Sequence, residues 1–321
     1  MKTIAVLALR NATMSSISDT MYFFETANRL LTKMGKGEKY LLTLVGFTQE
    51  VKIEGGRYTI RTDSTFEKAK RPDLIIIPAL TGHVASTTFI NKDCSAWISN
   101  NYMNGSEAAS LCTGAFLLAF SGILNGKECT THWDFANEFR YFYPAVNLVD
   151  ERLITDQDGI YSSGGNNAYW NLLLYLAEKY SGRDLAIRLA KFFVVDYNKN
   201  DQSPFIVFQG MKDHADKIIL KAQHIIEKSY VEKVTVDEIA DKIHLTRRTF
   251  ERRFKKATRH TVSEYIQKVK IEAAKKQLEI GRKSITEVMH SVGYSDVQAF
   301  RDMFKKITGM TPFDYRNKYK A

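Results

Sequence analysis

The sequence predicts an α/β domain built on a flavodoxin-like parallel-sheet sandwich, followed by an all-α double helix-turn-helix domain. Over the first two-thirds of the 321 residues, short apolar runs alternate with helical patterns, as in parallel strands joined by crossover helices. The last third contains one helix-turn-helix pattern twice. The charge divides at the same place, because residues 211–321 hold 25 Lys and Arg against 15 Asp and Glu, whereas residues 1–210 hold 21 of each.

Four apolar runs are the expected strands of the first domain, at residues 4–9, 40–45, 74–77 and 108–111. Helical patterns are found at residues 19–34, 89–103 and 113–120. Such a sheet is buried on both faces. Ligands of such folds lie beyond the carboxyl ends of the strands, so a site is expected in the loops that follow them.

The composition is that of a globular protein, with 44% apolar and 26% charged residues. The opening apolar run is too short for a signal peptide and meets Arg10 at once. No run approaches the roughly 18 apolar residues of a membrane span. The three cysteines lack the spacing of a disulfide framework or a zinc site. We therefore expect a cytoplasmic protein without a metal or cofactor.

The run at residues 108–111 leads into Cys112-Thr-Gly114 and then directly into a helical pattern. Small residues at a sharp strand-to-helix turn lift a nucleophile above the sheet. A thiol there faces the positive end of the helix, which favours the thiolate. The alternative is a small buried residue at a tight turn. His132 is a partner for the thiol on another loop and favours a functional site.

Several blocks of this half follow a known family in order and spacing. They are Cys112-Thr-Gly-Ala-Phe-Leu-Leu-Ala119, Gly122-Ile-Leu-Asn-Gly-Lys-Glu-Cys-Thr-Thr-His-Trp133, Phe142-Tyr-Pro144 and Ser162-Ser-Gly-Gly165. In these blocks residues 1–200 resemble the ThiJ/PfpI-like domain of GlxA-type regulators, which is related to class I glutamine amidotransferases. The resemblance implies a pocket lined by Cys112, His132 and an acid after the first strand.

The sequence departs from that family where catalysis would need it. The acid position falls on Ser16, with Asp19 three places further, and Asn171 replaces another acid. The family's Pro-Gly-Gly is Pro78-Ala-Leu80, which removes the glycines that let backbone amides approach an oxyanion. A thiol without an orienting acid or an oxyanion hole is a poor catalyst.

We therefore expect a small-molecule sensing pocket on a former enzyme scaffold, with Cys112 and His132 as vestigial catalytic residues. The expected lining is Ser16, Asp19, Leu80, Cys112, Thr113 and His132. Two alternatives stay open. One is a cysteine-dependent, amidase-like or glyoxal-processing hydrolase with an appended DNA-binding domain, and the other is a domain kept only for dimerisation.

A polar cluster at residues 198–204, ending in Pro204, interrupts the helical pattern that runs from Gly182 to residue 197. We place the first domain at residues 1–200, a linker at 201–216 and the second domain at 217–321. A helical stripe at residues 213–230 is either a linker helix or the first helix of the second domain.

The first helix-turn-helix copy covers residues 236–257. Thr246 is the predicted N-cap of its second helix. Phe250 and Phe254 are four residues apart and face the core, whereas Arg248 and Arg252 share another face. That face suits the major groove, where arginine binds guanine O6 and N7 or a phosphate.

The second copy covers residues 285–306, with Asp296 as the N-cap and Phe300 and Phe304 facing inward. Its outward positions, Val297, Gln298, Arg301 and Asp302, are less basic and more varied. Gln suits adenine, and Val suits a thymine methyl group. The second turn is one residue longer than the first, and Gly293 supplies its conformational freedom.

A helical pattern at residues 262–278 connects the copies. Such a helix is about 25 Å long at 1.5 Å per residue. It can hold the two reading helices near one turn of B-DNA apart, roughly 34 Å. A single chain could then read two successive major-groove segments.

This half resembles the AraC/XylS family along its length. The residues that carry the resemblance are Ile239-Ala240, Thr246-Arg-Arg-Thr-Phe-Glu-Arg-Arg-Phe254, Ile285, Gly293-Tyr-Ser-Asp296, Phe300, Phe304-Lys-Lys-Ile-Thr-Gly309, Thr311-Pro312 and Tyr315-Arg316. Two positions depart from the family: Arg259 stands where the first copy usually has Gly, and Met289 where the second usually has Ala. Arg259 must then end its helix without the freedom of glycine.

The resemblance implies that the outward positions of both reading helices face the groove. With Arg247 and Lys305 added, the expected DNA-binding residues are Arg247, Arg248, Glu251, Arg252, Val297, Gln298, Arg301, Asp302 and Lys305. Lys255, Lys256, Lys305 and Lys306 are either phosphate contacts or solvated side chains.

We therefore expect a sequence-specific transcriptional regulator. Its expected partners are double-stranded DNA, a small-molecule effector, a second copy of the chain and RNA polymerase, with no membrane.

Overall fold

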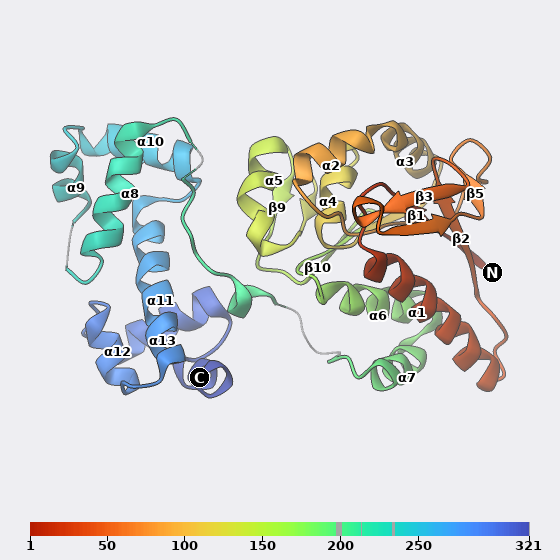
Figure 1. The fold of residues 1–321 in the computed structure, drawn as a ribbon. Coiled ribbons are helices and arrows are strands. Elements are labelled where there is room, and N and C mark those ends of the chain that lie inside the picture. Colours follow the sequence, from red (N-terminus) through yellow and green to blue (C-terminus); the bar gives the residue numbers. More distant parts are fainter. Residues whose placement is uncertain (197–200, 213, 233–234, 321) are drawn as a thin grey trace. The chain divides into compact units, whose positions relative to one another are not determined.

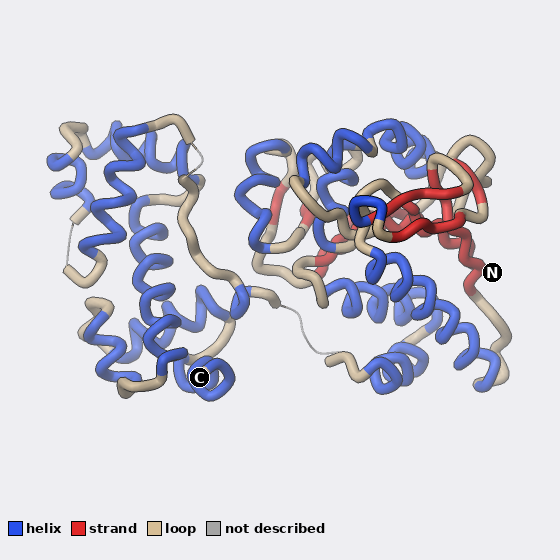
Figure 2. The backbone as a smooth tube through the Cα atoms, in the orientation of Figure 1, coloured by secondary structure: helices blue, strands red, loops and turns tan. Residues whose placement is uncertain are grey.

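The computed structural model describes residues 1–196, 201–212, 214–232 and 235–320. The chain forms two compact units, Met1–Gln202 and Ser203–Ala321. The first combines a sheet with helices, and the second contains helices only (Figures 1 and 2).

The first unit is built on a seven-stranded sheet with the order β10-β11-β7-β6-β1-β2-β5. Its strands are β1 (Lys2–Ala8), β2 (Tyr40–Gly46), β5 (Ser64–Thr65), β6 (Leu74–Ile77), β7 (Glu107–Ser110), β10 (Ile154–Gln157) and β11 (Ile160–Ser163). All neighbouring strands are parallel except β10 and β11. Two small ribbons lie outside it, β3 (Glu50–Ile53) with β4 (Tyr58–Arg61) and β8 (Glu128–Cys129) with β9 (Asn147–Leu148). The four predicted strands are β1, β2, β6 and β7, and the predicted parallel sheet is confirmed.

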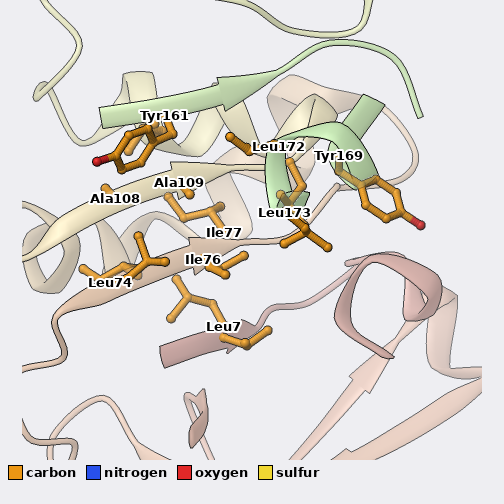
Figure 3. Close-up of a cluster of buried hydrophobic side chains, with 14 of the residues drawn as sticks. Leu7, Leu74, Ile76, Ile77, Ala108, Ala109, Tyr161, Tyr169, Leu172 and Leu173 are labelled. Carbon is orange, nitrogen blue, oxygen red and sulfur yellow. The ribbon is translucent and has the colours of Figure 1, made fainter. Parts of the chain in front are cut away.

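Helices cover both faces of the sheet (Figure 1). One face carries α1 (Met14–Lys33), α6 (Ala168–Ser181) and α7 (Arg183–Phe193), and the other carries α2 (Val84–Ile90), α3 (Ser95–Met103), α4 (Ala115–Phe120) and α5 (Ala136–Phe142). Leu172 and Leu173 of α6 lie over Ile77 and Ala109 in the central strands, and all four are buried (Figure 3). Burial on both faces explains why these strands are continuous apolar runs.

Two expected helices have different limits in the structure, because long-range hydrogen bonds shape their ends. α1 begins at Met14 rather than at residue 19, and the Met14 N–H donates to Glu54 from the β3–β4 region. The pattern at residues 89–103 is interrupted between α2 and α3. At the interruption, buried Asn91 accepts a hydrogen bond from the Arg10 N–H and donates one to the Arg10 carbonyl.

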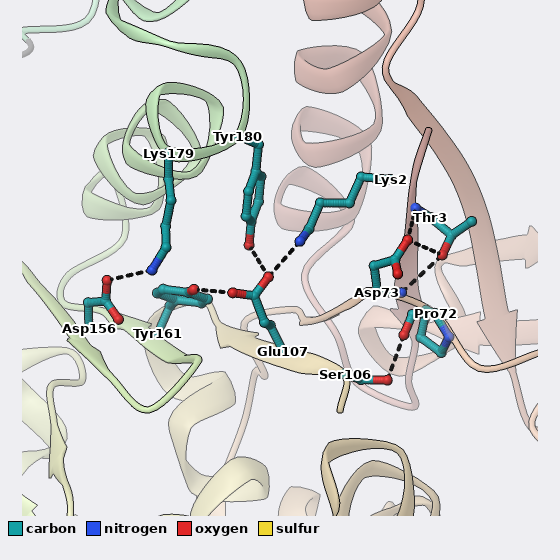
Figure 4. A network of polar contacts seen from close by, with 10 residues as sticks. All are labelled: Lys2, Thr3, Pro72, Asp73, Ser106, Glu107, Asp156, Tyr161, Lys179 and Tyr180. Atoms are coloured by element: carbon teal, nitrogen blue, oxygen red, sulfur yellow. Dashed lines mark hydrogen bonds and ion pairs between the residues drawn. The ribbon is translucent and has the colours of Figure 1, made fainter. Parts of the chain in front are cut away.

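The edge where the strands begin is held by partly buried polar groups (Figure 4). Glu107, the first residue of β7, accepts hydrogen bonds from Lys2 at 2.7 Å, Tyr161 at 2.5 Å and Tyr180 at 2.8 Å. Burial raises the pKa of Glu107, but these donors outweigh it and hold the pKa below the ordinary value. The Glu107 cluster lies at the opposite end of β7 from Cys112, and we assign it a structural role.

The second unit contains seven α-helices and one short 3-10 helix, Ser203–Phe205, among its described residues. The α-helices are α8 (Lys217–Ser229), α9 (Val236–Lys242), α10 (Arg247–Thr258), α11 (Val262–Ile280), α12 (Ile285–Ser291), α13 (Val297–Thr308) and α14 (Pro312–Tyr319). They form two hydrophobic cores. The first half of α11 contributes Val262 and Tyr265 to the core with α8, α9 and α10. The second half contributes Ile271, Ala274 and Leu278 to the core with α12, α13 and α14.

Part of the segment expected to be a linker packs on the second unit. Phe208 lies against Tyr265, and its N–H donates to Glu272 of α11. Lys275, also on α11, donates to the carbonyl of Ile206 and is paired with Glu272. The helix expected at residues 213–230 begins at Lys217. The helix expected to run from Gly182 to residue 197 ends earlier, at Phe193 of α7, because Val194 takes the left-handed conformation. Asp213, residue 197 and the start of the polar cluster at residues 198–200 lie outside the described residues.

Three general features of the described residues bear on function. Every helix among them is too short or too polar to cross a bilayer. The three cysteines are buried thiols. Within the described ranges, no group of three His, Cys, Asp or Glu side chains is placed to hold a metal ion.

Candidate nucleic-acid interface and cysteine elbow

The first helix-turn-helix has the predicted caps and inward face. Thr246 is the N-cap of α10, and its side chain accepts a hydrogen bond from the Thr249 N–H. Phe250 and Phe254 are fully buried in the first core. α9 begins with a capping box in which Thr235 and Glu238 bond reciprocally. These bonds satisfy helix N–H groups within the domain and fix how the exposed face of α10 is presented.

The second helix-turn-helix repeats this construction. Asp296 caps α13 by accepting from the Ala299 N–H at 2.6 Å. Phe300 and Phe304 are buried in the second core. Ser284 opens α12 with a second reciprocal capping box. The predicted N-cap and inward positions are thus confirmed in both copies.

The two turns differ by the predicted single residue. Four residues separate α9 from α10, and five separate α12 from α13. Gly293 is the second residue of the second turn and has a φ of 79°, and His244 takes the same place in the first turn with a φ of 56°. The predicted strain at Arg259 is also confirmed, because it ends α10 in the left-handed conformation with φ of 60°, where α13 ends at Gly309 with φ of 71°.

All nine expected DNA-binding side chains are exposed. On α10, Arg247 is paired with Asp237 at 2.9 Å and with Glu251 at 3.3 Å. Among the described residues, neither Arg248 nor Arg252 has an ion-pair partner within 4.0 Å. These two arginines are therefore available to a ligand, as are the exposed Lys255 and Lys256 in the last turn of α10.

The outward face of α13 has a different chemistry. The Gln298 amide donates to Asp302 at 2.8 Å. Val297 is 61% exposed, so its apolar side chain is accessible to a ligand. Arg301 has no ion-pair partner among the described residues. This face offers an apolar contact, an amide and one cation.

The first unit presents Cys112 at a strained strand-to-helix turn. Cys112 follows β7 with φ of 53°, a conformation that is costly for a residue with a side chain. Its N–H donates to Ser163 at 3.2 Å, and its carbonyl accepts from Thr131 at 3.0 Å. A side chain at Gly114 would lie 2.5 Å from the Pro78 carbonyl, so the turn requires a glycine there.

The expectation of a thiolate at this turn is wrong. Cys112 is only 4% exposed, and burial raises its pKa to about 11, although hydrogen bonds with Thr113 act in the opposite direction. Burial disfavours the charged form of a thiol. The short helix α4 does not compensate for this loss of solvent.

Backbone amides that would form an oxyanion hole are already occupied. The Ala79 N–H donates to Ser16 at 3.1 Å, at the position where the family has its acid. The Leu80 N–H donates to Thr113 at 2.8 Å, and the Thr113 hydroxyl donates back to the Leu80 carbonyl. Ser16 and Thr113 thus occupy the Ala79 and Leu80 amides, so neither amide is a free donor.

His132 and Asp19 have other partners. His132 Nδ1 accepts from the Asp134 N–H at 3.1 Å, so its other ring nitrogen carries the proton when the ring is neutral. Burial lowers the pKa of His132. Asp19 accepts from Tyr169 at 2.6 Å. Among the described residues, no hydrogen bond joins His132 or Asp19 to the Cys112 thiol.

Comparison with known proteins decides the family. The model of the DJ-1/PfpI family matches residues 3–179, more than half of the chain. The chain belongs to the DJ-1/PfpI family. The model of a helix-turn-helix domain matches residues 239–318. This member of the DJ-1/PfpI family therefore carries an AraC-type domain in its second unit.

Two curated relatives and one solved structure illustrate the similarity. HTH-type transcriptional regulator GbdR of Pseudomonas aeruginosa is 24% identical over 319 residues, covering 98% of this chain and 84% of GbdR. HTH-type transcriptional regulator ArgR of the same species is 27% identical over 219 residues, covering 68% of this chain and 66% of ArgR. A provisionally assigned transcriptional regulator from Vibrio parahaemolyticus has a TM-score of 0.53 at 21% identity, covering 60% of this chain and 98% of that one. This last likeness shows the α/β fold.

The DJ-1/PfpI unit also has a cavity away from Cys112. It measures about 520 Å³ and lies beyond the carboxyl ends of β1 and β2. Arg10, Asn11 and Phe47 line it from the strand ends, and residues of the β3–β4 hairpin line it from the other side. None of the six expected pocket residues lines this cavity.

Several residues around Cys112 could not be predicted from the sequence. Ser163 and Thr131 hold the backbone of Cys112, and Gln202 is buried beside Thr131 and Gly165. The Ser-Ser-Gly-Gly block was visible as a motif, but a glutamine in a polar cluster before a proline has the composition of a linker. Only its contacts with Gly165 and Thr131, which are distant in sequence, distinguish Gln202 from a residue of a linker.

Proposed function

We propose that this DJ-1/PfpI protein is a sequence-specific, DNA-binding transcriptional regulator whose first unit binds a small-molecule effector. The observation that carries the proposal is the paired reading helices, α10 and α13. Each is fixed to its own core by two buried phenylalanines, and each turns a polar, partly cationic face outward. GbdR and ArgR are named transcriptional regulators, which supports the same function for this chain.

α11 sets the relation between the two readers. It spans 19 residues, which is about 28 Å at 1.5 Å per residue. Because its two halves belong to different cores, it holds the two helix-turn-helix copies as one rigid reader. We infer that α10 and α13 enter successive major grooves on one side of the duplex, about one helical turn apart.

The outward faces of α10 and α13 differ in chemistry, so we assign them different contacts with DNA. Arg248 and Arg252 on α10 are free to take guanine bidentately or to hold phosphates. Val297 and Gln298 on α13 suit thymine and adenine, and Arg301 supplies the cation there. Arg247 is engaged by two carboxylates, and we assign it, with Lys305, to phosphate contacts.

The first unit is proposed as the sensor. This chain holds Cys112 as a buried thiol, and hydrogen bonds occupy the neighbouring amides of Ala79 and Leu80. These features support binding over turnover. A cysteine-dependent hydrolase is the alternative, and Ser16 at the position of the acid argues against it. Homodimerisation, a contact with RNA polymerase and action in the cytoplasm are further parts of the proposal.

Selection from a random pool of duplex DNA tests the function directly. The full chain is expected to enrich a motif with two conserved segments whose centres lie about 10 base pairs apart. A control variant that combines Arg248→Ala, Arg252→Ala and Arg301→Ala should enrich no motif. Enrichment of no sequence by the unaltered chain, or of the same motif by the control, would show that these helices do not read DNA.

A further inference from the structure

Gln202, the last residue of the first unit, is inserted into that unit rather than exposed on a linker. It is 2% exposed. Its backbone N–H donates to the Glu151 carbonyl at 2.9 Å. The backbone of the neighbouring Asp201 pairs with that of Arg152 in an isolated antiparallel β-bridge. The backbone is thus anchored on the segment before β10, and the side chain points inward from that anchor.

The carboxamide of Gln202 is bound at both ends. Its oxygen accepts from the Gly165 N–H at 2.8 Å. Its nitrogen lies 2.7 Å from the Asp150 carbonyl and 3.0 Å from the Thr131 carbonyl, with the Arg152 carbonyl and the Thr130 hydroxyl both at 3.3 Å. We call this group of one N–H and four oxygens the amide socket.

The amide socket recognises both halves of a primary amide. A carboxylate would place an oxygen against backbone carbonyls, which cannot donate to it. An ammonium or guanidinium group would satisfy the carbonyls but leave the partly buried Gly165 N–H without an acceptor, which is unfavourable. An amide has the acceptor and the two donors in the required places.

Two glycines make room for the carboxamide. A Cβ on Gly164 would lie 2.4 Å from Gln202 Oε1 and 2.5 Å from its Cδ and Nε2. Gly164 does not have a positive φ, so its backbone does not require a glycine. A Cβ on Gly165 would make contacts of 3.5 Å to Gln202 and 3.6 Å to His132, which are ordinary. The absence of a side chain at Gly164 therefore leaves the space that the Gln202 carboxamide fills.

The amide socket adjoins the cysteine elbow. Gly165 lies beside His132, and Thr131 provides a carbonyl to the socket and a hydroxyl to the Cys112 carbonyl. Ser203, which directly follows Gln202, begins the second unit. The socket is thus next to the strained turn at Cys112 and holds the residue that directly precedes the second unit.

From this geometry we infer that the amide socket is a binding site for a primary amide and that Gln202 is its resident, displaceable occupant. A free molecule with a primary amide group that enters the socket expels the Gln202 side chain. The end of the first unit is then released at the residue where the second unit begins. An effect of this release on DNA binding rests on the proposed function, whereas the existence of the amide site does not depend on that function.

Three variants of the full chain test the occupancy by hydrogen–deuterium exchange. Gln202→Glu keeps the size of the side chain but loses its donors, and Gly164→Ala pushes the carboxamide out by contact. Gly165→Ala is the matched control. Exchange of peptides covering residues 162–168 and 201–206 is expected to be roughly tenfold faster in the first two variants than in the control and the unaltered chain. Equal exchange in all four proteins would overturn the inference.

Propionamide, which is the glutamine side chain without its backbone, tests the site. In Gln202→Ala, millimolar propionamide is expected to restore slow exchange at residues 162–168. Propionate and propylamine, which each have half of the required chemistry, should not. If none of the three restores protection, or if all three do so equally, the socket is not an amide site.

A double variant distinguishes displacement from a general loss of structure. In Gln202→Ala, the clash that Gly164→Ala creates is absent, so the double variant should exchange no faster than Gln202→Ala alone. Additive effects would contradict the contact as the cause. These readouts need no DNA, so they can fail while the proposed function holds, and they can succeed in a chain that does not bind DNA.

Discussion

Arg253 on α10 holds Asp216, the N-cap residue of α8, through two hydrogen bonds of 3.0 and 2.7 Å. The same carboxylate accepts from the Ile219 N–H at 3.2 Å. One side chain therefore caps a helix and ties that helix to the first reading helix. Of the arginines on α10, Arg253 therefore belongs to the scaffold, whereas Arg248 and Arg252 have no ion-pair partner among the described residues.

Loss of Asp216 should loosen this joint. Asp216→Ala removes the cap of α8 and is expected to lower the free energy of unfolding of the second unit by about 1 kcal/mol. Asp216→Asn retains a capping oxygen and should cost less. Urea unfolding of the full chain, followed through the second unit, measures both. Equal losses in the two variants would mean that the cap contributes nothing.

The same joint should weaken in acid. The hydrogen bonds from Arg253 hold the pKa of Asp216 below its ordinary value. The contribution is therefore complete above the unfolded carboxyl pKa of about 3.9 and is lost as the pH falls through the lower folded pKa. The unfolding free energy of the unaltered chain should approach that of Asp216→Ala below pH 4. A constant difference down to the lowest pH would contradict the pairing.

Arg248 and Arg247 should differ in what they contribute to binding. Arg248→Ala is expected to cost about 1 to 3 kcal/mol on the preferred duplex and to relax the preference at one base pair. Arg247→Ala removes a cation already paired with Asp237 and Glu251, so it should weaken all duplexes alike, as should Lys305→Ala. Affinities for preferred and scrambled duplexes separate these outcomes. A uniform loss for Arg248→Ala would remove it from the base-reading set.

Cys112 should behave as an inert thiol. Because burial raises its pKa to about 11, alkylation by iodoacetamide should be slow at neutral pH and rise only toward that value. Mass spectrometry of the Cys112 peptide against pH gives the titration. A midpoint below about 8.5, the value of a free thiol, would indicate an activated nucleophile and favour the hydrolase alternative.

The ends of the two reading helices offer a reciprocal test. Arg259 takes the left-handed conformation that Gly309 takes in the second copy. Arg259→Gly should therefore stabilise the second unit by up to about 1 kcal/mol, and Gly309→Ala should destabilise it by a similar amount. Thermal unfolding measures both changes. Destabilisation by Arg259→Gly would show that the arginine side chain outweighs its backbone strain.

Local patterns in the sequence predicted the fold class and the reading helices. The strands β1, β2, β6 and β7 are apolar runs because both faces are buried, and the phenylalanine pairs and N-caps follow from helical spacing. The one-residue difference between the two turns and the strain at Arg259 could also be read from the chain.

Features that depend on contacts distant in sequence could not be predicted. Glu54 sets the start of α1, and Asn91 interrupts the next helical pattern. The thiolate expected at Cys112 followed from local helix geometry, whereas burial by the whole domain decides its protonation. Gln202 shows the same limit, because nothing in a polar cluster indicates which of its residues will be buried.

The salt dependence of duplex binding tests the central claim most directly. Fluorescence anisotropy of a labelled duplex with the full chain gives the association constant across a series of salt concentrations. Each phosphate contact should add about −0.9 to the slope of log K against log salt, and the cations on α10 and α13 predict a slope of roughly −3 or steeper. The absence of binding at roughly 50 mM salt, or a slope near zero, would contradict a DNA-binding regulator.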